Sequence, residues 1–132
     1  ATKRDGSLWQ DDCVEIFLKP DDEHPMKYYH IVINSKGVIY DSYARDKKWN
    51  GEIIAQTKIS SDHWTMECKI PFSSLGIDKK NLNKIWSANF IRTNYQGKKL
   101  EESSWSPTYA DSSHLPSRFG YLWFEKGQVI NL

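Results

Sequence analysis

A carboxylate within an apolar alternating stretch is the first feature that could support chemistry. Residues 8–18, Leu-Trp-Gln-Asp-Asp-Cys-Val-Glu-Ile-Phe-Leu, begin with an aromatic side chain beside two acids and then alternate strictly. Because successive strand side chains point to opposite faces, Val14 and Ile16 share an apolar face and Glu15 lies on the opposite face. A carboxylate at that position needs water, a cation or a hydrogen-bonding ligand. On spacing alone, the simpler interpretation is a face open to solvent, as one side of an antiparallel sheet often is.

Enzyme signatures are missing from the sequence. It contains no GxSxG, HExxH, P-loop or GxGxxG motif, and its two cysteines lack the spacing of a zinc site. Asp11 and Asp12 are adjacent and would point to opposite faces of a strand, whereas the two carboxylates of a glycosidase must flank one bond. The acidic run 21–23 offers hard oxygen ligands to calcium, but such a run is more often a solvated turn. The sequence therefore predicts no catalytic residue and assigns no metal ligand.

Two residues near the end of the chain are further candidates for ligand contact. His114 lies in the long polar segment 107–117, and irregular polar loops are where binding groups tend to collect. Trp105 suits a core position and a stacking platform equally well. The four histidines share no metal-ligand spacing, and His30 is expected on a strand face without a special role.

Short strands separated by turn signals must position these side chains. Strands are expected at residues 12–18, 26–34, 38–44, 53–59, 64–70, 85–93, 103–105 and 120–124, with a single helical turn at 71–76. Trp64, Met66, Cys68 and Ile70 should share a buried face, as should Trp86, Ala88 and Phe90. This number of short strands, with almost no helical periodicity, predicts an all-β fold, an antiparallel β-sandwich.

Composition narrows the class of partner. The 132 residues form one expected domain, 1–132, and a net charge of +1 favours neither nucleic acid nor an anionic membrane. No apolar run reaches the length of a membrane-spanning helix. Six Trp, seven Tyr and five Phe could supply flat platforms for sugars or bases as well as core packing. Cys13 and Cys68 both lie in expected strands, which favours buried thiols over a disulfide.

Several segments of the sequence match the motifs of a known family, in the order in which that family shows them. Residues 8–18 match W-x-D-D-x-V-E-I-F, and further matching segments occur at 29–34, 64–72, 86–92 and 114–120. Together they resemble family 9 carbohydrate-binding modules and the related DOMON-like domains over nearly the whole chain. The first motif is fairly specific, the final H-x-P-x-x-F-G moderately so, and the middle segments weakly. The resemblance implies an antiparallel sandwich of immunoglobulin or jelly-roll type and non-catalytic sugar binding, often at chain ends.

The resemblance also implies individual roles. Trp9 matches a stacking tryptophan, Glu15 a carboxylate that accepts sugar hydroxyls, and Asn34 a polar residue of the binding face. Trp9 and Glu15 are roughly 20 Å apart along an extended chain, so the loop must fold back for both to contact one sugar. An arginine of the sugar-binding members is replaced by Val32, and a second sandwiching tryptophan by Ser113. The predicted carbohydrate-binding residues are Trp9, Glu15, Asn34, Asn89, Arg92, Trp105 and His114.

Family members are usually attached to secreted polysaccharide-degrading enzymes or stand alone in bacterial glycan-use systems. The resemblance therefore implies an oligo- or polysaccharide partner, an extracellular, periplasmic or cell-surface location, and a catalytic domain elsewhere in the same protein. Some members hold structural calcium. Members also begin with an I-D-G…W segment and two or three strands before the first motif. The N-terminal portion is therefore expected to be missing from residues 1–132, which would leave a sheet edge open to another segment or chain.

Two other functions remain open from the sequence. Related sandwiches hold b-type haem between a methionine and a histidine or lysine, for which Met26 would have to converge with His30 or His114. Alternatively, the polar face only docks the domain within a larger glycoside hydrolase. The departures at Val32 and Ser113 leave open a different sugar or a loss of sugar binding.

Overall fold

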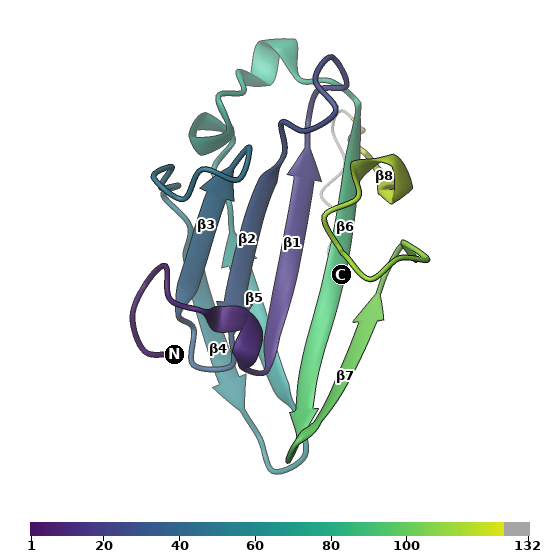
Figure 1. Ribbon diagram of the computed structural model, residues 1–132. Helices are drawn as coiled ribbons and strands as arrows, with labels where there is room; N and C mark the ends of the chain where they lie inside the picture. Colours follow the sequence, from purple (N-terminus) through teal and green to yellow (C-terminus); the bar gives the residue numbers. More distant parts are fainter. Residues whose placement is uncertain (126–132) are drawn as a thin grey trace.

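Strand β1, which contains the alternating motif, lies at the centre of the larger of two sheets (Figure 1). The computed structural model describes residues 1–125. Its strands are β1 Cys13–Lys19, β2 Tyr29–Asn34, β3 Ile39–Tyr43, β4 Ile54–Ile59, β5 Trp64–Lys69, β6 Ile85–Gln96, β7 Lys99–Ser104 and β8 Gly120–Trp123. Its short 3₁₀ helices are η1 Leu8–Gln10, η2 Phe72–Leu75, η3 Lys79–Asn81 and η4 Pro116–Arg118.

The main sheet has the antiparallel order β3-β2-β1-β6-β7, and β8 also pairs with β6. Residues 85–88 of β6 pair with β8, and residues 91–96 pair with β7, so both strands occupy the same edge in succession. β1 is hydrogen-bonded to a neighbour on each side over nearly its whole length. The central motif is therefore held on both sides, which fixes the direction of each of its side chains.

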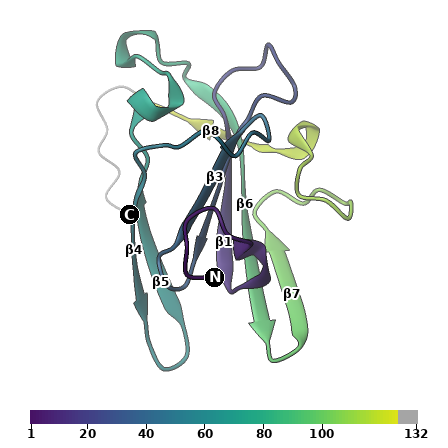
Figure 2. The same cartoon turned by 60° about the vertical axis from the view of Figure 1, so that its left-hand side comes forward.

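The second sheet is the β4–β5 hairpin, which packs against one face of the main sheet and makes the fold a β-sandwich (Figure 2). The core between the sheets contains Ile16, Leu18, Ile31, Ile33, Ile53, Leu75, Trp86 and Ala88. Met66 and Cys68 of β5 and Phe90 of β6 pack against this cluster. The alternation therefore correctly predicted the core faces of β1, β5 and β6, and the predicted fold class is confirmed.

The opposite face of the main sheet is also covered, so the expectation of an open, solvated face is wrong. Glu15 and Phe17 of β1 are buried on this side. Leu8 of η1 packs with Cys13, and Phe119 packs with Phe17. The cover consists of the N-terminal segment and of residues 105–119, which lack the periodicity that would have revealed them in the sequence.

Strand ends differ from expectation where turns intervene. β2 begins at Tyr29 because residues 24–27 form a turn, in which the amide of Lys27 donates to the carbonyl of His24. β6 extends beyond its expected end to pair with β7, which is itself longer than the expected strand at 103–105. The single helical turn at 71–76 is confirmed as η2, followed by Gly76 in the left-handed conformation.

Both cysteines are free thiols, as favoured by the sequence. Cys13 is fully buried, and burial together with the nearby Glu15 carboxyl group raises the pKa of its thiol to about 12. Cys68 lies on β5, in the other sheet, and is only half-buried. None of the helices within residues 1–125 is long and apolar enough to cross a membrane.

Candidate functional site

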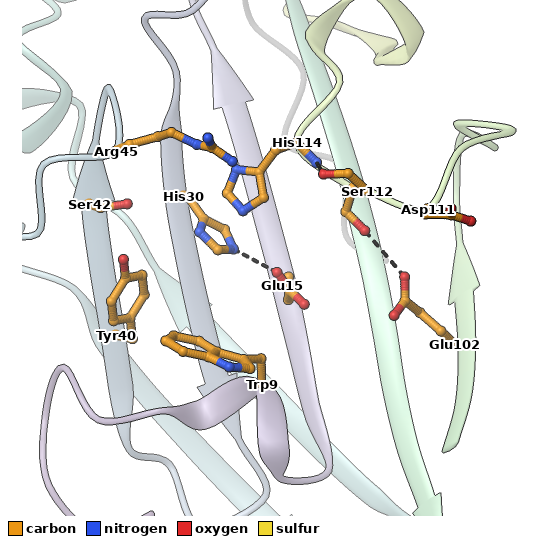
Figure 3. A pocket seen from close by; sticks show the side chains of 11 residues that line it. Trp9, Glu15, His30, Tyr40, Ser42, Arg45, Glu102, Asp111, Ser112 and His114 are labelled. Atoms are coloured by element: carbon orange, nitrogen blue, oxygen red, sulfur yellow. Dashed lines mark hydrogen bonds and ion pairs between the residues drawn. The ribbon is translucent and has the colours of Figure 1, made fainter. Parts of the chain in front are cut away.

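A pocket of about 420 Å³ lies on the face of the main sheet opposite the core (Figure 3). Strands β1, β2 and β3 supply its floor, η1 supplies one end, and β7 with residues 111–114 supplies the far wall. The lining residues are Trp9, Glu15, His30, Tyr40, Ser42, Arg45, Glu102, Asp111, Ser112, Ser113 and His114. The pocket therefore combines aromatic surface with many hydroxyl, carboxyl and imidazole groups.

The floor is a buried pair of Glu15 and His30. Glu15 Oε2 and His30 Nε2 are 2.7 Å apart, and both side chains are largely buried. Phe17 lies directly opposite His30 across β1 and β2, and its ring stacks on the imidazole at 4.3 Å between centroids. This packing fixes the imidazole, which in turn fixes one oxygen of Glu15. Within residues 1–125, the other oxygen, Oε1, accepts no hydrogen bond, so it can accept one from a ligand hydroxyl.

His114 closes the pocket above this pair. Its Nδ1 is 2.7 Å from the hydroxyl of Tyr28, and its ring lies edge-on to His30 at 4.7 Å. Burial, together with the neighbouring His30 and Arg45, lowers the pKa of His114 from 6.5 to about 4. The imidazole is therefore neutral at neutral pH. If Nδ1 accepts from Tyr28, the ring proton lies on Nε2, which can donate to a ligand.

Trp9 forms the aromatic end of the pocket. It stands next to Leu8 in η1, but Leu8 is fully buried whereas Trp9 is 46% exposed. Its indole meets the ring of Tyr40 edge-on at 5.7 Å. The loop thus folds back over β1, and Trp9 and Glu15 line the same pocket as the resemblance required.

The N-terminal segment holds η1 in this position. The amide of Asp5 donates to the carbonyl of Ile39 on β3. Arg4 Nη2 donates to Asp41 Oδ2 at 2.7 Å, and the amide of Gly51 donates to the same oxygen. Asp41 is fully buried, and this burial raises the pKa of its carboxyl group. The segment is therefore attached along β3, which positions Trp9 beside Tyr40.

Charged groups are separated across the pocket mouth. Arg45 follows β3, while Glu102 lies on β7 and Asp111 in the following loop, on the opposite wall (Figure 3). Glu102 Oε1 accepts a hydrogen bond from the hydroxyl of Ser113 at 3.2 Å. A ligand in the pocket therefore meets a cation on one side and carboxylates on the other.

Two of the predicted site residues share the pocket face but have other partners. The Asn34 amide nitrogen donates to Asp11, and its oxygen accepts from the Val38 amide in the turn between β2 and β3. Asn89 forms two hydrogen bonds of 2.9 Å with the backbone of Ser106. Both side chains are fully buried and neither lines the pocket, so they stabilise turns around it.

Two further predicted residues lie away from the pocket. Arg92 has the same strand parity as Phe90, so it points to the core side, where it pairs with Glu101 at 3.1 Å and lines a separate cavity beside Trp64. Trp105 packs edge-on against Phe90 at 5.6 Å. The alternation that placed Phe90 inward already placed Arg92 with it, so the expectation that Arg92 joins the site conflicted with the pattern itself.

Trp9, Glu15 and His114 are therefore the predicted residues that the pocket brings together. His30 was not predicted as a site residue. It lies an even number of positions before Asn34 along β2, so the alternation that places Asn34 on the face of Glu15 places His30 there too. Val32 is fully buried near Leu8, so an apolar residue suits this position. Arg45 and residues 111–113 carried no periodic signal, because they lie in turns and loops.

Metal and haem ligation receive no support from the described side chains. Residues 1–125 contain no group of three or more His, Cys, Asp or Glu arranged to hold a metal ion. Asp22 instead pairs with Lys19 at 2.9 Å, and Asp21 accepts from the amide of Glu23. Met26 is exposed on a turn outside the pocket, while His30 and His114 are hydrogen-bonded to Glu15 and Tyr28. Structural calcium remains a prediction from the resemblance alone.

Comparisons with known proteins agree with this architecture. A family model described as carbohydrate family 9 binding domain-like matches residues 1–126. A crystal structure of a candidate carbohydrate-binding protein from Bacteroides uniformis ATCC 8492 superposes with a TM-score of 0.70 at 20% sequence identity. The match covers 95% of this chain and 66% of that one, so this chain spans just under two thirds of its neighbour. No curated protein matches the sequence.

Proposed function

The chain belongs to the carbohydrate family 9 binding domain-like family, and from this premise we propose that its pocket binds a sugar residue of an oligo- or polysaccharide without chemically changing it. The observation that carries the proposal is the position of Trp9. A partly exposed indole is held at the mouth of a pocket whose floor is a buried carboxyl–imidazole pair. A sugar ring has an apolar face that can stack on an aromatic ring and hydroxyls that need several placed donors and acceptors.

The pocket lining includes donors and acceptors that support this proposal. Glu15 Oε1 can accept from one hydroxyl, and Nε2 of neutral His114 can donate to another. Glu102 and Asp111 add acceptors on the far wall. The volume of about 420 Å³ falls within the usual range for small-ligand sites and suits one or two sugar residues.

The setting of the domain is part of the same proposal. Family membership supports a role as an accessory module of a secreted, periplasmic or cell-surface protein of bacterial polysaccharide use. The partner in the same protein would be a glycoside hydrolase or another catalytic domain, with the module itself non-catalytic. Haem binding and simple domain docking are less well supported, because the ligand-facing groups of the pocket already suit a sugar.

Calorimetric titration with cello-, xylo- and manno-oligosaccharides tests the proposal. We expect binding in the micromolar to millimolar range with at least one series, and loss of the signal when Trp9 is replaced by alanine. Absence of binding to all three series, and to their monosaccharides, at millimolar concentration would remove sugar binding as the function of this pocket.

A further inference from the structure

Arg45 is the one permanently charged cation of the pocket lining, and no ion pair within residues 1–125 involves it. Its guanidinium lies close enough to Tyr28 and His114 to affect the pKa values of both. Those two neighbours are uncharged at neutral pH: burial raises the pKa of Tyr28 further above its ordinary value of 10 and lowers that of His114 to about 4. The charge of Arg45 is therefore directed to the pocket without a charged partner on its own side.

The backbone that carries Arg45 is strained. Ala44 and Arg45 have backbone φ angles of 49° and 67°, which residues other than glycine rarely adopt. Tyr43 and Asp46 exchange two backbone hydrogen bonds, of 2.8 and 3.1 Å, around this two-residue turn. Glycine or asparagine would fill such a turn at lower cost. Strain that persists in a turn beside a pocket is typical of residues placed for ligand binding rather than for stability.

The carboxyl groups of the pocket do not offset this cation directly. Glu15 is bonded to His30 on the floor, and Glu102 and Asp111 occupy the opposite wall (Figure 3). A sugar bound across the pocket would present hydroxyls to the acidic wall and its other edge to Arg45. An arginine fork is well matched to a carboxylate or sulfate oxygen pair.

We propose that the glycan bound in this pocket carries an oxyanion, a uronate carboxylate or a sulfate ester, on the edge that faces Arg45. This inference rests on the proposed function and names the substrate class of the same site. Arg45 would then make the pocket select an anionic sugar over the neutral sugar of the same ring geometry, because only the anionic sugar can form a charge-assisted hydrogen bond to the guanidinium.

Matched sugars provide the experiment. The dissociation constants of methyl glucoside, methyl glucuronide and glucose 6-sulfate, with the corresponding galactose and mannose series, are measured by calorimetry for the wild type, Arg45→Gln and Arg45→Lys. We expect at least one anionic sugar to bind about 10-fold or more tightly than its neutral counterpart, and this ratio to fall to near one in Arg45→Gln. Arg45→Lys should recover part of the ratio. The preference should also weaken as salt concentration rises.

Lys47→Gln is the matched control, since it removes one charge from the same exposed loop outside the pocket. It should leave the ratio of anionic to neutral sugar affinity unchanged.

Equal affinity for neutral and anionic sugars in the wild type would overturn this inference and leave the proposed function standing. Absence of binding to every sugar would overturn both this inference and the proposed function. If Lys47→Gln lowered the affinity ratio as much as Arg45→Gln, the preference would come from the net charge of the protein and not from Arg45, which would also overturn this inference.

Discussion

The exposure of Trp9, at the mouth of the pocket, is not explained by folding alone. The side chain is 46% exposed, and its contact with Tyr40 is an edge contact at the mouth of the pocket. Neighbouring Leu8 already provides the buried anchor of η1. We therefore attribute to Trp9 a binding role that can be separated from stability.

Replacing Trp9 by alanine should weaken sugar binding by about 2 kcal/mol, or roughly 30-fold, because the aromatic stacking surface of the site is lost. The melting temperature should change little. Calorimetry and thermal unfolding measure the two effects, and Trp123→Ala is the control, being exposed outside the pocket. A large drop in melting temperature with unchanged affinity would show that Trp9 is a packing residue.

His114 gives the free energy of unfolding a predictable pH dependence. Its pKa is about 4 in the folded protein against 6.5 in an unfolded chain. Between these values the unfolded chain binds a proton that the folded protein does not, so stability is lost as the pH falls through this window. His114→Gln removes this contribution and should therefore lose less stability than the wild type between about pH 7 and about pH 5.

Urea unfolding at several pH values measures this difference. His24→Gln, an exposed histidine in the turn before β2, should show the same pH dependence as the wild type. Parallel stability curves for the wild type and His114→Gln would mean that His114 titrates in the folded protein as it does in an unfolded one.

At the level of elements, the sequence predicts strands well and their covering segments poorly. Alternation correctly identified β1, β5 and β6 and their core faces, because burial on one side imposes a period of two. The prediction that the loop carrying Trp9 folds back over Glu15 came from the family resemblance, not from the alternation. Residues 105–119 and the turn at Arg45 have no periodicity, since their positions depend on contacts with distant strands rather than on local pattern.

Asn89 illustrates such a contact and provides a test at this scale. Its buried amide binds both backbone groups of Ser106, which attaches β6 to the segment that carries His114. Asn89→Ala leaves a partly buried N–H and C=O of Ser106 without partners and should cost about 2 kcal/mol of unfolding free energy. Sugar affinity should fall as well, because the wall of the pocket loosens.

Denaturant unfolding and calorimetry measure both effects. Asn94→Ala on the same strand is the control, because the Asn94 side chain makes no hydrogen bond within residues 1–125 and does not line the pocket. Full stability in Asn89→Ala would show that water replaces the hydrogen bonds lost with the Asn89 side chain.

Across the whole molecule, the two sheets differ in how firmly they are held. β1 and β2 each have hydrogen-bonded neighbours on both sides, whereas within residues 1–125 β4 and β5 pair only with each other. Residues of β4 and β5 alternate between half-buried and exposed, and none is fully buried. A two-stranded sheet contributes little stability of its own and depends on packing.

Native-state hydrogen exchange should therefore show the fastest exchange of strand amides in β4 and β5 and the slowest in β1 and β2. The comparison within one protein needs no variant, since β1 serves as the internal reference. Equal protection in both sheets would indicate that the hairpin unfolds only together with the main sheet.

The two thiols have a consequence for where the protein can be produced. Cys13 lies on the pocket face of the main sheet and Cys68 on the second sheet, with the sandwich core between them. No cross-link is part of the folded state, so folding consumes no oxidant. The domain should reach the same fold in a reducing cytosol as in an oxidising exterior, and reductant in the buffer should have no effect on its sugar affinity. A host cell for its expression can therefore be selected for yield alone.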